Sequence, residues 1–297
     1  MNASQEQTDL PSSTSLELSF LDAARADGRL NNRLRAGWPR FTCLLRVIDD
    51  QTSKLLRFKT IHQEAALENQ IVIKSPDGTF RAYISRPAKL PAPAVVVLQE
   101  LFGVNADIRT TCYELAAQGF IAIAPDLFWR QEPGVDLDVT SEADWQHGLR
   151  LYGAYDRDAG AKDIMAVVRS VVELPESTGK IALQGYCLGA LMAFITAVRS
   201  DVDAAVAYHG ADTEKYLGEV GRLHAPLLMH LGEEDEFISK TAQTQIKAAL
   251  AAKANATVYS YPGQRHAFSR HNGAHYNAAA AALANGRTSE FLHQQLR

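Results

Sequence analysis

From Ile71 to the C terminus, short β-branched runs alternate with Ala-rich amphipathic segments. The short runs are almost continuously apolar, as expected of parallel strands covered on both faces. The longer segments repeat apolar residues at helical spacing, which is typical of helices that connect such strands. This alternation predicts an α/β protein with one doubly wound, mostly parallel sheet of about eight strands and helices on both faces.

An antiparallel hairpin opens the predicted sheet, because the turn residues Pro76, Asp77 and Gly78 separate its two strands. The predicted strands are 71–74, 80–85, 94–99, 120–124, 180–184, 204–208, 227–231 and 257–261. The predicted helices are 108–118, 144–155, 159–173, 190–200, 239–252 and 278–293. We therefore expect a single domain over residues 70–297.

Residues 1–69 differ in texture from the rest of the chain. A Ser/Thr/Gln-rich start is followed by a stretch with several arginines and little periodicity. We expect an N-terminal extension with weak or no regular structure and no catalytic role. A flexible tail, an overlong gene model and a partner-binding arm are the alternatives for this segment.

Composition excludes several classes of partner. The chain has 30 basic and 34 acidic residues and a formal net charge of −4, which offers no broad footprint for a nucleic acid. Its apolar runs are shorter than the roughly 18 residues of a membrane span. The acidic N-terminal region resembles neither a secretory signal nor a transit peptide. We predict a soluble, cytoplasmic protein that acts on a small molecule, with a monomer favoured.

The most informative motif is Gly185-Tyr186-Cys187-Leu188-Gly189, which joins a predicted strand to a predicted helix. This G-x-C-x-G pattern is a nucleophile elbow with Cys in place of Ser. Such a sharp turn leaves no room for neighbouring side chains, which explains the two glycines. The helix N-terminus favours a thiolate at Cys187, and the N–H of Leu188 becomes a candidate oxyanion donor.

Chain order supplies partners for this nucleophile. In α/β-hydrolases the nucleophile, acid and base follow one another along the chain, each after a parallel strand. Asp235 follows the strand at 227–231, and His266 follows the strand at 257–261. We predict that Asp235 orients the imidazole and that His266 withdraws the thiol proton and later activates water.

Other histidines offer weaker alternatives. His271 and His275 have an i, i+4 spacing that suits a metal on a helix, but no third ligand of convincing spacing accompanies them. His209 at a strand end is a rival base that comes too early in the chain order, and we interpret it as structural. We therefore predict neither a metal site nor a cofactor.

With these residues in place, the region from Ile71 onward resembles the dienelactone hydrolase family, also called carboxymethylenebutenolidases. The resemblance covers about three quarters of the chain. Its motifs, all in family order, are Gln99-Glu100-Leu101-Phe102-Gly103-Val104-Asn105, Pro125-Asp126-Leu127, Gly185-Tyr186-Cys187-Leu188-Gly189 and residues 263–270. It implies an α/β-hydrolase fold and a triad of Cys187, Asp235 and His266.

The resemblance implies three further roles. Glu100 corresponds to a glutamate that contacts the resting thiol and accepts its proton when substrate arrives, which protects the thiol from oxidation until then. Leu101 would supply the second oxyanion N–H. Arg270 would orient a substrate carboxylate by bidentate hydrogen bonding.

The sequence departs from the family pattern in the helical region after Pro125-Asp126-Leu127. Family members that act on dienelactone carry an arginine and, four residues later, a tyrosine there. The ungapped register places Trp145 and Leu149 at these positions, whereas a slip would bring Arg150 or Tyr152 into place. With Trp145 and Leu149 as substrate-binding residues, the pocket is more apolar and its preferred substrate differs from dienelactone.

The leading hypothesis is a cofactor-free hydrolase of a small ester or lactone. A broader carboxylesterase or thioesterase is the alternative among enzymes. A noncatalytic sensor or binding protein that uses Cys187 as a reversible thiol is the alternative from another class. Catalysis is favoured because a sensor needs no acid and base in elbow order.

Overall fold

The structure, a computed structural model, describes residues 69–271 and 273–297. Its framework is an 8-stranded sheet with the strand order β1-β2-β4-β3-β5-β6-β7-β8. β1 pairs with β2, and β2 with β4, in antiparallel fashion, while the other neighbours are parallel. The strands are β1 (Gln70–Ser75), β2 (Gly78–Ser85), β3 (Ala92–Leu98), β4 (Ile121–Pro125), β5 (Ser177–Tyr186), β6 (Ala204–Tyr208), β7 (Leu227–Gly232) and β8 (Ala256–Tyr261).

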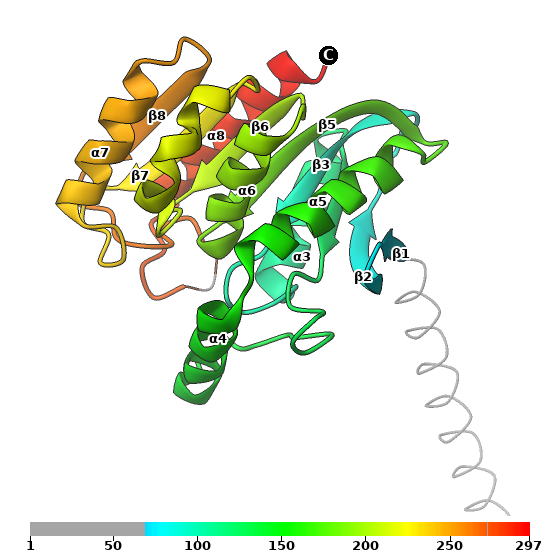
Figure 1. Cartoon of the computed structure of the whole chain (residues 1–297), viewed down its shortest axis with the longest axis horizontal. Coiled ribbons are helices and arrows are strands. Elements are labelled where there is room, and N and C mark those ends of the chain that lie inside the picture. The colour runs from blue at the N-terminus through cyan, green and yellow to red at the C-terminus, as the bar shows by residue number, and fades with distance from the viewer. Residues whose placement is uncertain (1–68, 272) are drawn as a thin grey trace, which may run out of the picture. The chain divides into compact units, whose positions relative to one another are not determined.

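Helices cover both faces of this sheet (Figure 1). They are α3 (Ala106–Ala117), α4 (Glu142–Ala154), α5 (Arg157–Val172), α6 (Leu188–Arg199), α7 (Lys240–Ala251) and α8 (Ala278–Gln295), with a 3-10 helix η1 (Thr213–Arg222). α5 and α6 lie on one face, and α3 and α8 lie on the other. α4 lies beyond the carboxyl ends of the parallel strands, away from both layers.

Alternating side chains of the strands build the two halves of the core. In β3, Val96 packs in the cluster that includes α5 and α6, whereas Val95 and Val97 pack in the cluster with α3 and α8. All three are fully buried, which explains why β3 is apolar at successive positions rather than at every second one. α6 is buried along almost its whole length, which explains why its sequence is apolar all round and not amphipathic.

The predicted fold class is confirmed, and each predicted strand and helix is present. Boundaries differ by a few residues: α6 begins at Leu188 rather than 190, and β5 extends from Ser177 to Tyr186. η1 was not predicted, because a 3-10 helix does not produce the 3.6-residue periodicity on which the helix predictions rest. The prediction for residues 1–69 lies almost wholly outside the described residues. Within the described chain, no helix combines the length and apolarity that crossing a bilayer demands.

Candidate active site

Cys187 occupies a strained turn between β5 and α6. Its φ of 52° and ψ of −111° are unusual for a residue with a side chain, which costs about 1–3 kcal/mol. Both flanking glycines are needed for this turn. A Cβ on Gly185 would lie 2.0 Å from the carbonyl oxygen of Gly189, and one on Gly189 would lie 2.1 Å from that of Leu98. The steric reason predicted for the two glycines is confirmed.

Two backbone N–H groups beside the sulfur have no acceptor within the described chain. They belong to Leu188, at the first position of α6, and to Leu101, just after β3. The N–H of Gly189, by contrast, donates to Gln99 O at 2.9 Å and fixes the start of α6 against the end of β3. The fold therefore leaves free the two donors that the sequence predicts for an oxyanion hole, and their catalytic role stays a prediction.

Asp235 and His266 lie together, as chain order predicts. Nδ1 of His266 is 2.9 Å from Oδ2 of Asp235, and both side chains are buried. The backbone N–H groups of Phe237 and Ile238 also donate to Asp235 Oδ1, at 2.8 and 3.1 Å. The carboxylate is thereby fixed in position, and it leaves Nε2 of His266 available to another group.

The electrostatics link this pair to the cysteine. Burial disfavours the charged ring, but a Coulombic interaction and a hydrogen bond with Cys187, together with the hydrogen bond to Asp235, raise the pKa of His266 to about 10. The structure thus brings Cys187, His266 and Asp235 into one line of interacting groups. Their assignment as a catalytic triad remains a prediction.

Glu100 lies at the same edge of the sheet but bonds to a different partner from the one expected. Its two oxygens accept from Nε and Nη2 of Arg270 at 2.6 and 2.8 Å in a buried bidentate pair. Burial would raise the pKa of Glu100, yet the Arg270 guanidinium and the nearby His209 outweigh it and hold this pKa well below its usual range. Among the described residues, the side-chain hydrogen bonds of Glu100 go to Arg270 and none goes to Cys187.

A cavity of about 140 Å³ opens above the sulfur. Its walls are largely apolar, with Arg270 and Asp212 as charged members, and its lining consists of Leu101, Trp145, Leu149, Tyr152, Cys187, Ala211, Asp212, Phe237, His266 and Arg270. A larger groove of about 510 Å³ lies near β2 and contains none of the predicted site residues. The smaller cavity is the candidate substrate pocket, because it alone of the two contacts a nucleophile.

Residues from both of the registers that the sequence left open around α4 line the cavity. Trp145 and Leu149 both line the cavity, and the Trp145 ring packs edge-on against Phe102 with a centroid distance of 4.9 Å. Tyr152 also lines the cavity, but its hydroxyl donates to Asp212 at 2.7 Å. Arg150 is exposed and lies outside the cavity lining.

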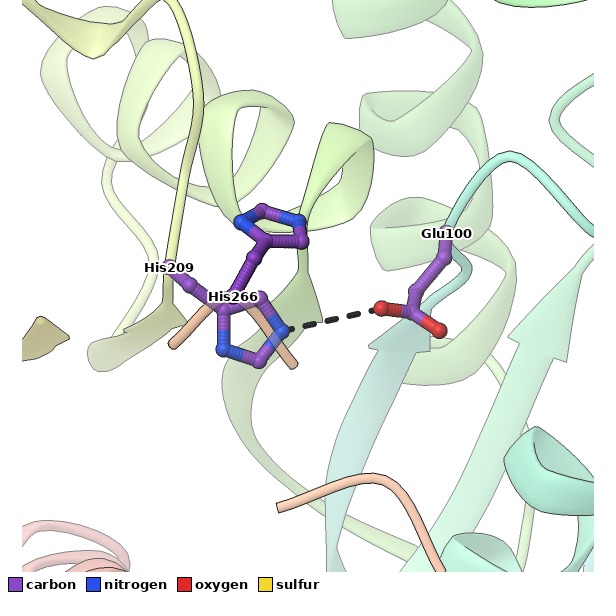
Figure 2. A group of neighbouring side chains, drawn as sticks. All are labelled: Glu100, His209 and His266. Carbon is purple, nitrogen blue, oxygen red and sulfur yellow. Dashed lines mark ion pairs between the residues drawn. The ribbon is translucent and has the colours of Figure 1, made fainter. Parts of the chain in front are cut away.

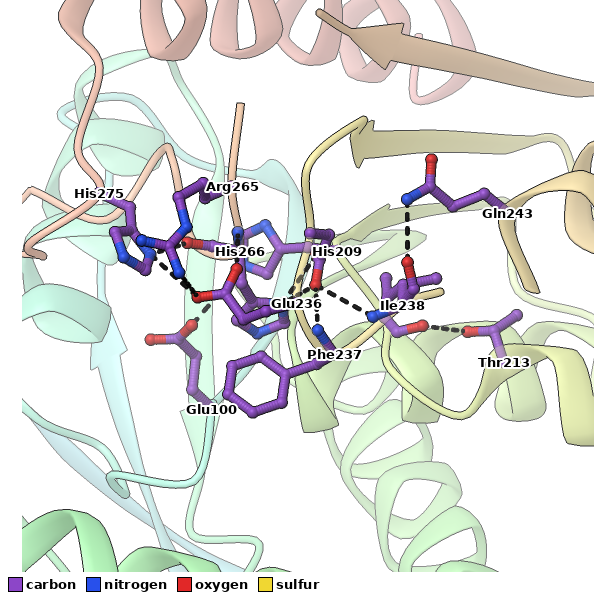
Figure 3. A network of polar contacts seen from close by, with 12 residues as sticks. Glu100, His209, Thr213, Glu236, Phe237, Ile238, Gln243, Arg265, His266 and His275 are labelled. Carbon is purple, nitrogen blue, oxygen red and sulfur yellow. Dashed lines mark hydrogen bonds and ion pairs between the residues drawn. The ribbon is translucent and has the colours of Figure 1, made fainter. Parts of the chain in front are cut away.

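Two residues of the site were not assigned to it from the sequence. Figure 3 shows Glu236, whose carboxylate accepts from the backbone N–H of His266 at 3.2 Å and from Arg265 at 3.1 Å. His209 was interpreted as structural, yet its ring faces Glu100 (Figure 2) and lies beside His266, with a centroid distance of 4.7 Å between the two rings. Its place after β6, at the same carboxyl edge as His266, was the signal available for it.

The loop that carries His266 and Arg270 is anchored by a third histidine. Nδ1 and Nε2 of His271 lie 2.8 Å from Asp107 and 3.1 Å from Glu114, both in α3. These hydrogen bonds outweigh the opposing effect of burial and raise the pKa of His271 to about 10. Its role is structural in this arrangement, and not that of a metal ligand paired with His275.

Comparisons with known proteins identify relatives over most of the chain. Residues 80–296 match the model of the dienelactone hydrolase family. A carboxymethylenebutenolidase from Pseudomonas putida is 41% identical over 227 residues, which cover 76% of this chain and 96% of the relative. Carboxymethylenebutenolidase 1 from Cupriavidus pinatubonensis is 34% identical over 215 residues, covering 72% and 92%. A crystal structure of a predicted dienelactone hydrolase from Klebsiella pneumoniae is similar with a TM-score of 0.67 at 27% identity, covering 76% of this chain and 97% of the other.

A Gly189→Ala substitution tests the contact between α6 and β3. We expect a loss of roughly 3 kcal/mol in the free energy of unfolding, because the new methyl group meets the backbone of Leu98. Urea unfolding measures the loss. Gly286→Ala in α8, where no atom lies within 4 Å of the added Cβ, is the matched control and should be neutral or slightly stabilising. Equal stability of the two variants would contradict the proposed constraint.

A His271→Gln substitution tests the anchor of the loop through its pH dependence. Because the folded-state pKa is raised, the charged ring adds its full stability below about pH 6.5, and this contribution disappears as pH rises to about 10. We expect a deficit of about 1 kcal/mol in the free energy of unfolding at pH 6, limited by solvent exposure, that shrinks toward pH 10. Urea unfolding across this pH range measures the deficit, and the exposed His224→Gln is the control. A deficit that does not change with pH would show that the anchor is not ionic.

Proposed function

The chain belongs to the dienelactone hydrolase family, and from this premise we propose that it hydrolyses a small ester or lactone through Cys187. The observation that carries the proposal is the alignment of Cys187, His266 and Asp235 at the floor of a cavity, next to two free backbone N–H groups. The family and the fold support carboxylic ester hydrolysis, and the residues supply its chemistry. A cytoplasmic location and a monomeric state remain predictions.

The first half of the reaction forms an acyl-enzyme. The thiol proton of Cys187 passes to Nε2 of His266, and the sulfur attacks the carbonyl carbon. The negative charge that develops on the carbonyl oxygen is stabilised by the N–H groups of Leu188 and Leu101. The C–O bond then breaks, and the departing oxygen takes a proton from Nε2 of His266. In a lactone that oxygen remains attached to the acyl group through the opened ring.

The second half returns the free enzyme. His266 accepts a proton from water, the resulting hydroxide attacks the thioester carbon, and the C–S bond breaks to release the acid and regenerate the sulfur nucleophile. Asp235 keeps the ring in the tautomer that presents Nε2 and stabilises the imidazolium. Its two bonds from the backbone at 237 and 238 keep it from rotating away during these proton transfers.

An anionic substrate would also act on the ion pair between Glu100 and Arg270. A substrate carboxylate that binds Arg270 must compete with Glu100 for the same N–H donors. Glu100, once displaced, becomes a second acceptor for the proton of Cys187 beside His266, as the family resemblance implies.

A broader carboxylesterase is the second candidate, and the cavity lining favours it. Trp145 and Leu149 provide apolar wall, while the donors of Arg270 are already occupied by Glu100. A neutral acyl group enters such a cavity without displacing a buried ion pair. The two candidates share Cys187 and the same steps, and they differ only in the charge of the preferred substrate.

Substitution of the triad tests the mechanism. Cys187→Ala should lower kcat by about 10⁴-fold or more, and Asp235→Asn by about 10³–10⁴-fold because the ring loses its correct tautomer. Steady-state assays on an aryl ester measure both effects. The control is Cys112→Ala, which removes the buried thiol of α3 and should leave kcat at the wild-type value. Retained turnover in Cys187→Ala, or an acyl group trapped on another residue, would overturn the proposal.

A comparison of substrates separates the two candidates. If Trp145 and Leu149 set the specificity, kcat/KM for neutral aryl esters should exceed that for a dienelactone by about tenfold or more. The measurement is a pair of kcat/KM values for the same enzyme preparation. A kcat/KM that is about tenfold higher for the dienelactone would instead show that a substrate carboxylate displaces Glu100 from Arg270 efficiently.

A further inference from the structure

Glu100, His209 and His266 form a buried cluster whose possible ligand atoms all lie within 4.8 Å of one another. The three residues come from the loops after β3, β6 and β8, which meet at one edge of the sheet (Figure 2). Their exposed fractions are 3%, 0% and 3%. Two imidazoles and one carboxylate from distant segments of the chain therefore lie close together in the interior.

Within this cluster, His209 is the residue whose polar atoms lack hydrogen-bond partners among the described residues. Neither of its ring nitrogens has a hydrogen-bond partner in the described part of the chain, and Nε2 faces Oε1 of Glu100 at 3.6 Å, slightly beyond hydrogen-bond length. A buried polar group without a partner costs about 1–3 kcal/mol. Its φ of 44° adds backbone strain, so the fold carries two costs at this one position.

The other described histidines that are buried do have partners. His230 lies 2.8 Å from the hydroxyl of Tyr261 and 3.0 Å from that of Thr288, and His266 bonds to Asp235. Both ring nitrogens of His209 lack a hydrogen-bond partner within the described chain, so the ring has a nitrogen to offer to a metal ion.

The remaining two members can each offer a ligand atom. Asp235 bonds to Nδ1 of His266, so Nε2 is the nitrogen that would bind a metal in place of its hydrogen bond with Cys187, and a carboxylate behind the ring is the usual support of a metal-binding histidine. Oε1 of Glu100 accepts one hydrogen bond from Arg270 and has a second lone pair. Two histidines and one glutamate are a ligand set found in zinc sites.

We propose that His209, His266 and Glu100 form a site for Zn²⁺, and that the bound ion reversibly inhibits the hydrolase by occupying Nε2 of His266. Ligand atoms around tetrahedral zinc are roughly 3.4 Å apart, so the separations of up to 4.8 Å must shorten by up to about 1.4 Å when the site binds the ion. The proposed inhibition rests on the proposed function, because it is measured as a loss of the Cys187 reaction. The binding of the ion is measured separately and does not depend on that function.

The competing explanation is a zinc ion held by Cys187 and His266 alone, which any cysteine hydrolase could allow. Substitutions distinguish the two arrangements. His209→Phe removes the ligand and keeps a ring against Tyr208 and Phe268, while His209→Asn removes it with a residue that tolerates positive φ. Cys187→Ala removes the sulfur and leaves the proposed ligands intact.

The experiment titrates the full chain with ZnCl₂ by calorimetry and measures ester hydrolysis with and without added EDTA. We expect one zinc ion to bind both wild type and Cys187→Ala, and the dissociation constant to rise by at least about tenfold in His209→Phe and His209→Asn. Both His209 variants should resist inhibition, measured for each variant as the ratio of its rates with and without zinc. His224→Ala is a surface control that should bind zinc as wild type does.

Two outcomes would overturn the proposal. One is equal zinc affinity in wild type and in both His209 variants, which would place the ion elsewhere. The other is loss of binding in Cys187→Ala with retention in His209→Phe, which would assign the ion to the cysteine and His266. A Cys187→Ala variant that still hydrolyses esters would instead refute the proposed function, and it would leave the calorimetric result interpretable.

Discussion

The contact between the start of α6 and the end of β3 is the constraint on which the site depends. The N–H of Gly189 donates to Gln99 O, and no side chain fits between these backbones. Leu188 precedes this contact point in α6, and Leu101 follows it after β3. One hydrogen bond of 2.9 Å therefore sets the distance between the two candidate oxyanion donors and places Cys187 beside them. The strain at Cys187 persists because the packed strand and helix on either side hold the turn in place.

Buried charge at this edge is organised in two pairs, and the pairs behave differently. The bond between Asp235 and His266 is reinforced by backbone N–H groups, so it stays fixed while protons move. The pair of Glu100 and Arg270 depends on side chains alone, and one of its members faces the cavity. An incoming anion can exchange partners with the second pair but not with the first. The ring of His209 lies beside His266 and faces Glu100, so it is a neighbour of both pairs.

The sequence predicted those parts of the structure that depend on local pattern and chain order. Continuous apolar runs identified the strands, and the rule that active groups follow parallel strands brought Cys187, Asp235 and His266 to one edge. Contacts between side chains from distant loops have no such signal. The bidentate pairing of Glu100 with Arg270 joins residues 170 positions apart, and the resemblance suggested a thiol partner for Glu100 instead. His209 was set aside because chain order has a single place for a base, although its position after β6 brought it to the same edge.

In the proposed mechanism, the chemistry and the specificity depend on different kinds of structure. The reactive groups lie at the ends of central strands, where packing on both faces and paired hydrogen bonds leave few alternative positions. Trp145 and Leu149 instead belong to α4, which lies outside both helical layers and is mostly exposed. A substitution in α4 changes the wall of the cavity without disturbing the sheet, so substrate preference can diverge while the reaction is kept. The same reasoning explains why the motifs of the elbow identify the reaction, whereas the identity of the acyl group depends on a helix whose contacts to the core are few.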